Sequence, residues 1–531
     1  MTECPCVRVC RRLVVSALTA FCLWRSFDTA SAYFEADGVY ACSDGWRTAA
    51  RCAPEGGVAL LCNDADVIAP LDRSRLIAIA WERAPDPISQ VDAKSGFESA
   101  GCVLSSSWHS RSVGKRLEEC GFSVVATNEY VKTWGRAEAV RAAGSSSVGR
   151  VSPARESVAL TLWFLLAVGW IRLAAGPRGI GLLPAAVALG VVAALGCVAL
   201  SHPLLEPNGL GVYGGKAKLW YLCGGMPSAF LESIGGAVLQ PSYPPGLALL
   251  AYFHFVLSGG CGDRLVQLLP VLAAGLLCFA LTRDGRNRLT ALPAALFCLS
   301  PVAIRLTSGF YAEPFVALLL VTGWGMMREG RLRAGACILG LAGLFRPEAG
   351  VVAVVFAFFG GWFRGGRFPA LFAAAFASVP ALAWLVACAA FGFGTVQDWN
   401  FLVSPKAGQS VVAAGELLKS LSELAVPTFA IACLARGRSA SFASDVADGP
   451  WRIGRDLLRA SVPAALLLLA IPLACGFYAA PQARWMIGNT VPRLAWYLLA
   501  VPLSELLRRP VKSTCYPKNG YAKTSLAELV S

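Results

Sequence analysis

Three carboxylates stand at the ends of apolar stretches, where acidic side chains are uncommon. Glu206 directly follows one such stretch, Glu313 lies in F-Y-A-E-P-F, and Glu348 lies in F-R-P-E-A-G. A carboxylate at the end of a membrane helix is costly unless it faces a polar cavity, so these acids are candidates for proton transfer or cation binding. Simpler interpretations stay open for two of them. Glu313 could complete a helix dipole, and Glu348 could pair locally with Arg346.

Basic and aromatic residues accompany these acids. Arg346 and Arg493 are expected on the same side of the membrane as the three acids, which favours a shared polar cavity more strongly than any one of these residues would. A Pro- and Gly-rich loop over 202–263 carries further polar residues, namely Asn208, Tyr213, Lys216, Lys218 and Tyr243. For the two lysines the alternative is an anchor at the membrane surface, where Trp and Tyr also gather.

The composition decides which elements must position these residues. Of 531 residues, 56% are hydrophobic and only 15% are charged, and the mean hydropathy is +0.57. Soluble domains of this total length cannot bury so much apolar sequence, which excludes an ordinary cytosolic enzyme and a disordered chain. We expect a mainly α, polytopic helical membrane protein of about eleven spans. The expected spans are 158–174, 179–201, 264–282, 289–306, 313–327, 335–345, 349–363, 368–391, 424–435, 460–479 and 488–507.

The distribution of charge predicts the orientation of these spans. The net charge is +14, but Arg and Lys fall in short clusters between apolar runs, which argues against nucleic acid as a partner. If the segment 33–150 is exported, every inside loop is basic, and so is the cytoplasmic tail 508–531. We therefore expect an integral membrane protein whose segment 33–150 and candidate acids lie on the extracytoplasmic side.

The first 150 residues predict export. In 1–32, three Arg residues precede the apolar stretch 13–24, and A-S-A at 30–32 offers a cleavage site, so this segment is a signal peptide or an uncleaved signal anchor. Segment 33–150 predicts a small extracytoplasmic α/β domain. Its strand-length runs are 58–62, 76–81, 102–105 and 122–127, with helical spacing over 112–120.

The order of several short motifs resembles a known family. An acid after a span, K-A-K with aromatics, Y-P-P, Y-A-E and R-P-E-A-G follow one another as in the Rgt-type bacterial members of the GT-C membrane glycosyltransferases, relatives of the dolichyl-phosphate-mannose protein mannosyltransferases. The resemblance covers about 157–507 and implies a GT-C-like transmembrane glycosyltransferase domain there. Such enzymes transfer a sugar from a polyprenyl-phosphate carrier at the outer membrane face. The resemblance therefore also implies a bacterial inner (plasma) membrane with an extracytoplasmic active site.

The resemblance also implies roles for individual residues. Where relatives carry D-x-D, this chain has Glu206 and Asn208, so Glu206 is the implied catalytic base. Arg346 and Glu348 stand where relatives keep a cation and an acid, and Arg493 resembles the Arg that opens the last span. Glu313 and Glu348 would be supporting acids. The loop or acceptor residues would be Asn208, Tyr213, Lys218 and Tyr243.

The implied reaction is a single displacement. An acceptor hydroxyl attacks C1 of the sugar, Glu206 removes its proton, and Arg346, Arg493 and Lys216 neutralise the departing phosphate, which predicts inversion at C1. The partners would be a polyprenyl-phosphate-linked hexose or pentose, the bilayer, and a glycan, lipid or protein acceptor. The sequence predicts no cofactor or metal ligands and leaves the use of a divalent metal open. The alternatives are a secondary transporter or lipid flippase, or a catalytically silent anchor of an exported binding domain.

Overall fold

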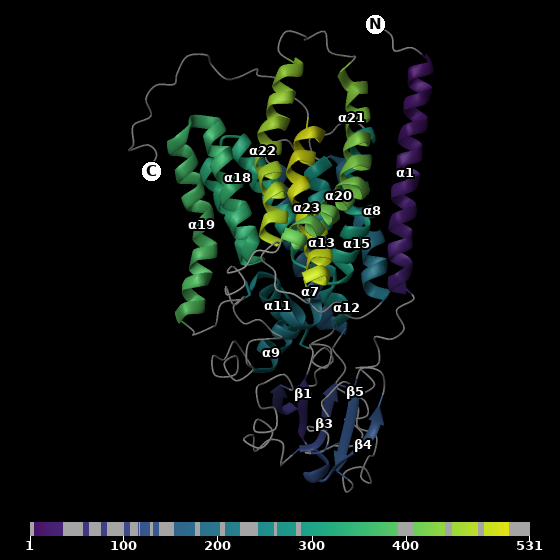
Figure 1. Cartoon of the computed structure of the whole chain (residues 1–531), viewed down its shortest axis with the longest axis vertical. Helices are drawn as coiled ribbons and strands as arrows, with labels where there is room; N and C mark the ends of the chain where they lie inside the picture. The colour runs from purple at the N-terminus through teal and green to yellow at the C-terminus, as the bar shows by residue number, and fades with distance from the viewer. Residues whose placement is uncertain are drawn as a thin grey trace.

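The protein is a helical bundle with a small β-sheet at one end (Figure 1). The computed structural model describes residues 5–34, 57–62, 76–81, 100–106, 115, 117–127, 131–136, 153–175, 181–201, 208–223, 243–259, 263–282, 288–390, 407–440, 449–475 and 483–508. Most described residues are helical. The short helices α9, α11 and α12 lie between the bundle and the sheet, at the end of the bundle that carries the candidate site described below (Figure 1).

The helices follow the apolar segments of the sequence. In chain order they are α1 (Pro5–Phe34), α7 (Pro153–Ala175), α8 (Leu182–Ser201), α9 (Lys216–Cys223), α11 (Gly246–Ser258), α12 (Asp263–Val266), α13 (Leu268–Thr282), α14 (Arg288–Cys298), α15 (Pro301–Ser308), α16 (Glu313–Arg328), α17 (Leu332–Gly340), α18 (Pro347–Gly365), α19 (Arg367–Ala390), α20 (Ala407–Ser420), α21 (Val426–Ala440), α22 (Gly449–Cys475) and α23 (Ala483–Leu507). Two π-helices, η4 (Asn208–Gly215) and η7 (Leu421–Ala425), and a 3-10 helix, η5 (Leu341–Leu344), interrupt or join them.

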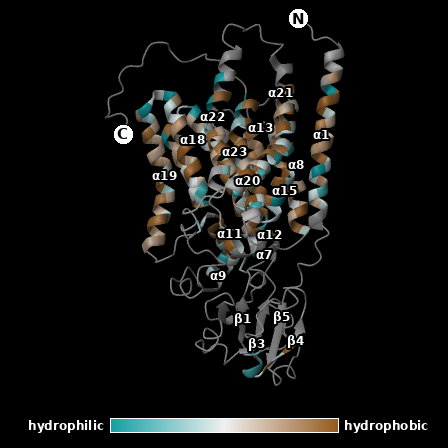
Figure 2. Ribbon diagram, viewed as in Figure 1, coloured by the Kyte–Doolittle hydropathy of each residue, from teal (hydrophilic) through white to brown (hydrophobic). Residues whose placement is uncertain are grey.

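Several helices are suited to a membrane. Among the described residues, four are long and apolar enough to cross one, and the pair α14–α15, bent by 52°, would make a fifth. The four are Leu182–Ser201, Pro347–Gly365, Arg367–Ala390 and Gln409–Leu434. Hydrophobic residues dominate the bundle (Figure 2), and large apolar side chains such as Phe27, Leu182 and Phe368 are exposed on its surface. These features support a membrane protein. The eleven crossings remain a prediction, since other apolar helices are shorter.

One expected span has different limits in the structure. The sequence predicts a span over 424–435 that follows an outer loop, but α20, η7 and α21 form a membrane-length helix, Gln409–Leu434. The polar residues Glu416, Lys419 and Glu423 lower the hydropathy of its first half, which explains the misplaced boundary.

The centre of the bundle is α16. Nearly every residue from Glu313 to Met327 is buried, as expected for a helix that is apolar on all sides. Helix α17 packs tightly against it: a Cβ added at Gly323 would lie 2.7 Å from the carbonyl oxygen of Gly335. Small residues therefore allow the two backbones to approach, as is common between membrane helices. Helices α13, α18 and α23 also contact α16.

The described strands of the N-terminal region form one mixed sheet. Its order is β2 (Leu76–Trp81), β1 (Gly57–Cys62), β3 (Ala100–Ser106), β5 (Val131–Arg136) and β4 (Phe122–Thr127). Strand β1 is parallel to β2 and β3, whereas β5 is antiparallel to β3 and β4. The four apolar runs in the sequence coincide with β1 to β4. Strand β5 has no continuous apolar run and was not predicted.

Candidate functional site

Two arginines share one buried carboxylate at the beginning of α16. Arg346 forms an ion pair through Nη1 with Glu313 Oε1, and Arg493 Nη1 lies 3.5 Å from the same oxygen. The Glu313 side chain is fully buried, and both arginines are about 6% exposed. Arg346 also contacts Glu348, with Nη2 2.5 Å from Oε1. Buried side chains stay charged only when they are paired, so the ion pairs of this cluster are what allow its charges inside the bundle.

The loop before α16 sets the position of Glu313. The chain turns sharply after α15, and Phe310 has φ 56°, a left-handed conformation that is unusual for an aromatic residue. Glu313 then begins α16, and Pro314 in its first turn has a backbone suited to a helix start. The ring of Phe315 stacks on Phe345 with centroids 5.0 Å apart, which joins the first turn of α16 to the residue before Arg346. A strained backbone position beside buried charges is typical of a functional site.

Helix α23 supplies the second guanidinium. Arg493 Nε donates to the carbonyl oxygen of Asn489 at 2.7 Å, which fixes the plane of the side chain. One turn further along, Trp496 stacks on Phe297 with centroids 5.1 Å apart, and its Nε1 donates to the Phe297 carbonyl oxygen at 3.2 Å. Packing against α14 therefore orients the face of α23 that carries Arg493.

Tyrosines flank both guanidiniums. The Cζ atom of Arg346 lies 5.7 Å from the centroid of Tyr243, and that of Arg493 lies 4.9 Å from the centroid of Tyr311. Tyr213 meets Tyr243 edge-on, with centroids 5.8 Å apart. Cation–π contacts of this kind are strongest where water is excluded. Tyr497 on α23 lies within electrostatic reach of Arg346 and of the two acids that pair with it.

Lys216 adds a third buried cation beside the tyrosines. It opens α9 and is 1% exposed, and its Nζ donates to the carbonyl oxygen of Tyr243 at 3.1 Å. Burial lowers the pKa of Lys216 to about 7. The preceding η4 approaches the turn before α16 so closely that a Cβ at Gly209 would lie 2.5 Å from the carbonyl oxygen of Gly309. This contact holds η4 against the same turn that positions Glu313.

Several buried polar atoms in the cluster have no hydrogen-bond partner among the described residues. They include Glu313 Oε2, Arg346 Nε, Asn489 Oδ1 and Tyr497 Oη. Buried polar groups in native proteins are almost always satisfied by protein, water or ligand. Hydrogen-bond donors and acceptors are thus both available for a polar ligand that carries negative charge and hydroxyl groups.

The structure places the predicted site residues as follows. Arg346, Glu313, Glu348, Arg493, Tyr213, Tyr243 and Lys216 come together in one cluster. Asn208 lies at the start of η4 and Lys218 in α9, but the positions of their side chains are outside what the structure describes. Glu206, the predicted base, lies outside the described residues.

Sequence reasoning missed three members of the cluster. Tyr311 lies two residues before Glu313, whereas Asn489 and Tyr497 lie one helical turn on either side of Arg493. Spacing of four residues on α23 was the available signal, because such residues share one helix face.

The described residues contain no group of three or more His, Cys, Asp or Glu side chains that could hold a metal ion. No protein-family model, curated protein or solved structure matches the chain.

Proposed function

We propose that this protein is a membrane glycosyltransferase that moves a sugar from a polyprenyl-phosphate carrier to an acceptor hydroxyl. The supporting observation is the buried pair Arg346–Arg493 around Glu313, whose unsatisfied donors and acceptors suit a phosphorylated, hydroxyl-rich ligand. The position of the cluster among apolar helices suits a donor with a lipid tail.

Each side chain has one role in a single displacement. The acceptor oxygen forms a bond to C1 of the sugar, the bond from C1 to the phosphate oxygen breaks, and the acceptor proton passes to Glu206. Arg346 and Arg493 stabilise the phosphate that leaves, with Lys216 adding charge when it is protonated. One oxygen of Glu313 holds both guanidiniums in place, and its other oxygen, Oε2, is available to accept a hydrogen bond from a hydroxyl group of the ligand.

Glu348 is the carboxylate that a donor phosphate could replace. Its side chain is 32% exposed, whereas Glu313 is fully buried, although both pair with Arg346. A phosphate offers Arg346 the same bidentate geometry as a carboxylate. Glu348 would therefore swing away when donor binds, and Glu313 would keep its place.

A transport function is the second candidate, because the described helices include discontinuous elements. The α14–α15 pair is bent by 52°, and the π-helix η7 interrupts another membrane-length helix. Broken helices often line substrate sites in transporters. A lipid flippase would move the same class of glycolipid without cleaving it.

One assay separates the two candidates. Purified full-length protein in lipid vesicles is supplied with radiolabelled polyprenyl-phosphate hexoses and pentoses and a membrane extract as acceptor source. We expect label to move from the lipid to an acceptor, with release of polyprenyl phosphate, and we expect Arg346→Gln to abolish that release. Label that changes leaflet while it remains attached to the lipid would instead identify a flippase.

A further inference from the structure

The N-terminal helix α1 does not end where a signal peptide would be cut. It runs without interruption for 30 residues, from Pro5 to Phe34, and so includes the A-S-A sequence at 30–32. A peptide bond must leave a helix to enter a protease, because cleavage requires an extended chain. Ala30 is moreover buried and belongs to the main hydrophobic core of the bundle. The expected cleavage site is thus both helical and packed.

The two faces of α1 differ in the way expected of a packed membrane helix. The exposed face carries large apolar side chains, including Leu13, Leu23, Trp24 and Phe27. The face turned toward the bundle is instead rich in small or polar residues at helical spacing, namely Thr19, Cys22, Arg25, Ser26, Thr29 and Ala30. Small and polar residues at helix contacts, with large apolar ones toward lipid, are typical of membrane bundles. A removable signal needs only a hydrophobic stretch and no such pattern.

An ion pair joins α1 to the bundle. Arg25 Nη2 lies 3.5 Å from Glu423 Oε1 in η7. Glu423 lies near the middle of the membrane-length helix Gln409–Leu434, where an unpaired carboxylate would be costly. Arg25 also lies 3.7 Å from Asp28, but the Asp28 side chain is mostly exposed. Loss of α1 would leave Glu423 without this cation.

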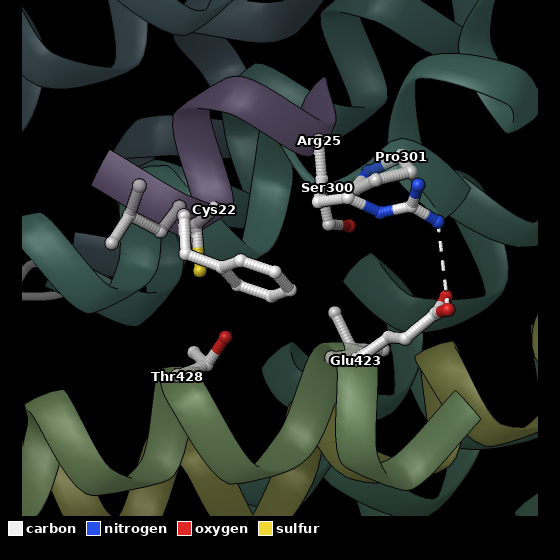
Figure 3. A pocket seen from close by; sticks show the side chains of 9 residues that line it. Cys22, Arg25, Ser300, Pro301, Glu423 and Thr428 are labelled. Carbon is white, nitrogen blue, oxygen red and sulfur yellow. Dashed lines mark hydrogen bonds and ion pairs between the residues drawn. The ribbon is translucent and has the colours of Figure 1, made fainter. Parts of the chain in front are cut away.

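Two helix irregularities lie where α1 contacts the bundle, close to the Arg25–Glu423 ion pair. Helix α1 packs against α15 and α21, and more weakly against α8 and α14. A small pocket opens where Arg25 and Cys22 meet Ser300 at the α14–α15 bend and Thr428 on α21 (Figure 3). The bend and the π-helix η7 thus both occur where α1 docks, and together they supply polar groups to its polar face.

We propose that α1 is a permanent membrane helix of the mature protein. It packs against α15 and α21, is held there by the Arg25–Glu423 ion pair, and is not removed after export. The contacts that carry this inference are separate from the Arg346–Glu313–Arg493 cluster, so it does not depend on the proposed transferase activity.

The first test determines the N-terminus of the mature chain. Full-length protein with a C-terminal affinity tag is purified from membranes, and its intact mass and N-terminal sequence are measured. We expect the mature chain to retain the whole of α1, Pro5–Phe34. A chain that begins close to residue 33 would overturn the proposal.

The second test measures whether α1 stays bound to the bundle after the chain that connects them is cut. A specific protease site is inserted within 35–56, the purified protein is cut, and the tagged bundle is recovered again in mild detergent. We expect the α1 fragment to remain with the parent bundle, and Arg25→Ala or Glu423→Ala to reduce the amount retained at least about twofold. Asp28→Asn serves as the control and should leave retention unchanged. Complete loss of the fragment from the parent bundle would show that α1 has no stable place there.

A charge reversal tests the ion pair itself. We expect Arg25→Glu and Glu423→Arg each to lower the thermal midpoint of the uncut protein by about 1 °C or more, since the shift for a given loss of stability becomes smaller as the chain becomes longer. The reversed pair, with both changes, should recover at least half of the combined loss. Losses that simply add would contradict a direct interaction between the two residues.

Discussion

Arg493 Nη1 and Glu313 Oε1 lie 3.5 Å apart and join the beginning of α16 to α23. The same two helices are joined again near their other ends, where Arg328 of α16 pairs with Glu505 of α23. Helix α16 therefore carries an acid at its start and a cation at its end, and α23 carries them in the reverse order. The first pair lies in the candidate site and the second does not. Substitutions at the two ends can consequently separate effects on chemistry from effects on stability.

The first prediction concerns the coupling between Glu313 and Arg493. Glu313→Gln removes the charge that two buried guanidiniums share, and Arg493→Gln removes one of those guanidiniums. Each single change should lower the free energy of unfolding by about 3–5 kcal/mol, because it leaves buried charge uncompensated. The double variant should lose less than the sum, with a coupling of about 0.5–3 kcal/mol. Denaturant unfolding in a fixed detergent measures all three, and strictly additive losses would mean that the 3.5 Å contact carries no energy.

The second prediction concerns the geometry at Arg493. Arg493→Lys keeps the charge but cannot reproduce the planar fork that donates both to the Asn489 carbonyl oxygen and toward the site. We expect kcat/KM for the lipid-linked donor to fall by about 10-fold or more. The matched control is Arg331→Lys, an exposed residue at the N-terminus of α17, which should leave the kinetics unchanged. An unchanged kcat/KM in Arg493→Lys, as in the Arg331→Lys control, would show that Arg493 does not bind the donor.

The third prediction concerns the base. Glu206→Gln keeps the shape of the side chain but cannot accept the acceptor proton, so transfer should fall by about 10²-fold or more while donor binding persists. Measurement of donor affinity and of single-turnover transfer separates these two effects. Asn208→Asp, which restores the second acid of the D-x-D pattern, serves as a comparison and should not reduce transfer. Full activity in Glu206→Gln would move the base to Glu313 or Glu348.

Every charged residue of the described cluster was a candidate from the sequence, for a physical reason. Charged residues within apolar segments are rare because their burial is costly, so Glu313, Arg346 and Arg493 are conspicuous in the sequence alone. What the sequence does not contain is their pairing. Residues 313, 346 and 493 meet only because α16, α18 and α23 pack together, and that depends on close contacts such as the stacking of Phe315 on Phe345.

Aromatic members of the site were harder to predict. Tyr311 and Tyr497 lie in segments rich in aromatic residues, where a tyrosine is as easily explained by packing or by the membrane interface. Some helices were likewise hard to predict from the sequence. Apolar runs located most helices, but η4 and α20 contain too many polar or glycine residues to be recognised by hydropathy. Both are stabilised by tertiary contacts that single-sequence periodicity does not contain.

The fourth prediction concerns pH. Because burial lowers the pKa of Lys216 to about 7, its ammonium is present below that pH and is lost above it. If Lys216 contributes charge at the donor phosphate, kcat/KM should fall as pH rises through about 7, since this parameter reports the free enzyme. Lys216→Arg should remove this pH dependence and keep the high value, whereas Lys216→Met should remove it and keep the low value. A parent profile that is flat from pH 6 to 8 would exclude Lys216 from donor binding.

The same shift has a consequence for stability with the opposite sign. Between about pH 7 and the ordinary lysine pKa of 10.5, the unfolded chain binds a proton at Lys216 that the folded chain does not. The contribution of this residue to the free energy of unfolding therefore increases with pH across that window. The comparison of parent and Lys216→Met unfolding at pH 7 and pH 9 isolates the contribution of this one side chain.

The fifth prediction concerns the pair at the far end of α16 and α23. The Glu505 side chain is fully buried, accepts a hydrogen bond from Trp324 Nε1 at 3.0 Å, and pairs with Arg328 and with Arg508 at 3.5 Å. Glu505→Gln keeps the acceptor for Trp324 but removes the charge that faces two arginines, so unfolding free energy should fall by about 2 kcal/mol. Glu329→Gln, a change at an exposed residue beside Arg328, is the control and should change the free energy of unfolding by no more than about 0.5 kcal/mol.

The Glu505→Gln substitution should leave catalysis unchanged. Because this end of the bundle holds no proposed ligand group, the kcat/KM of Glu505→Gln measured well below its thermal midpoint should equal that of the parent. A large loss of kcat/KM in folded Glu505→Gln would show that the two ends of α16 are coupled, and would end their use as independent probes of chemistry and stability.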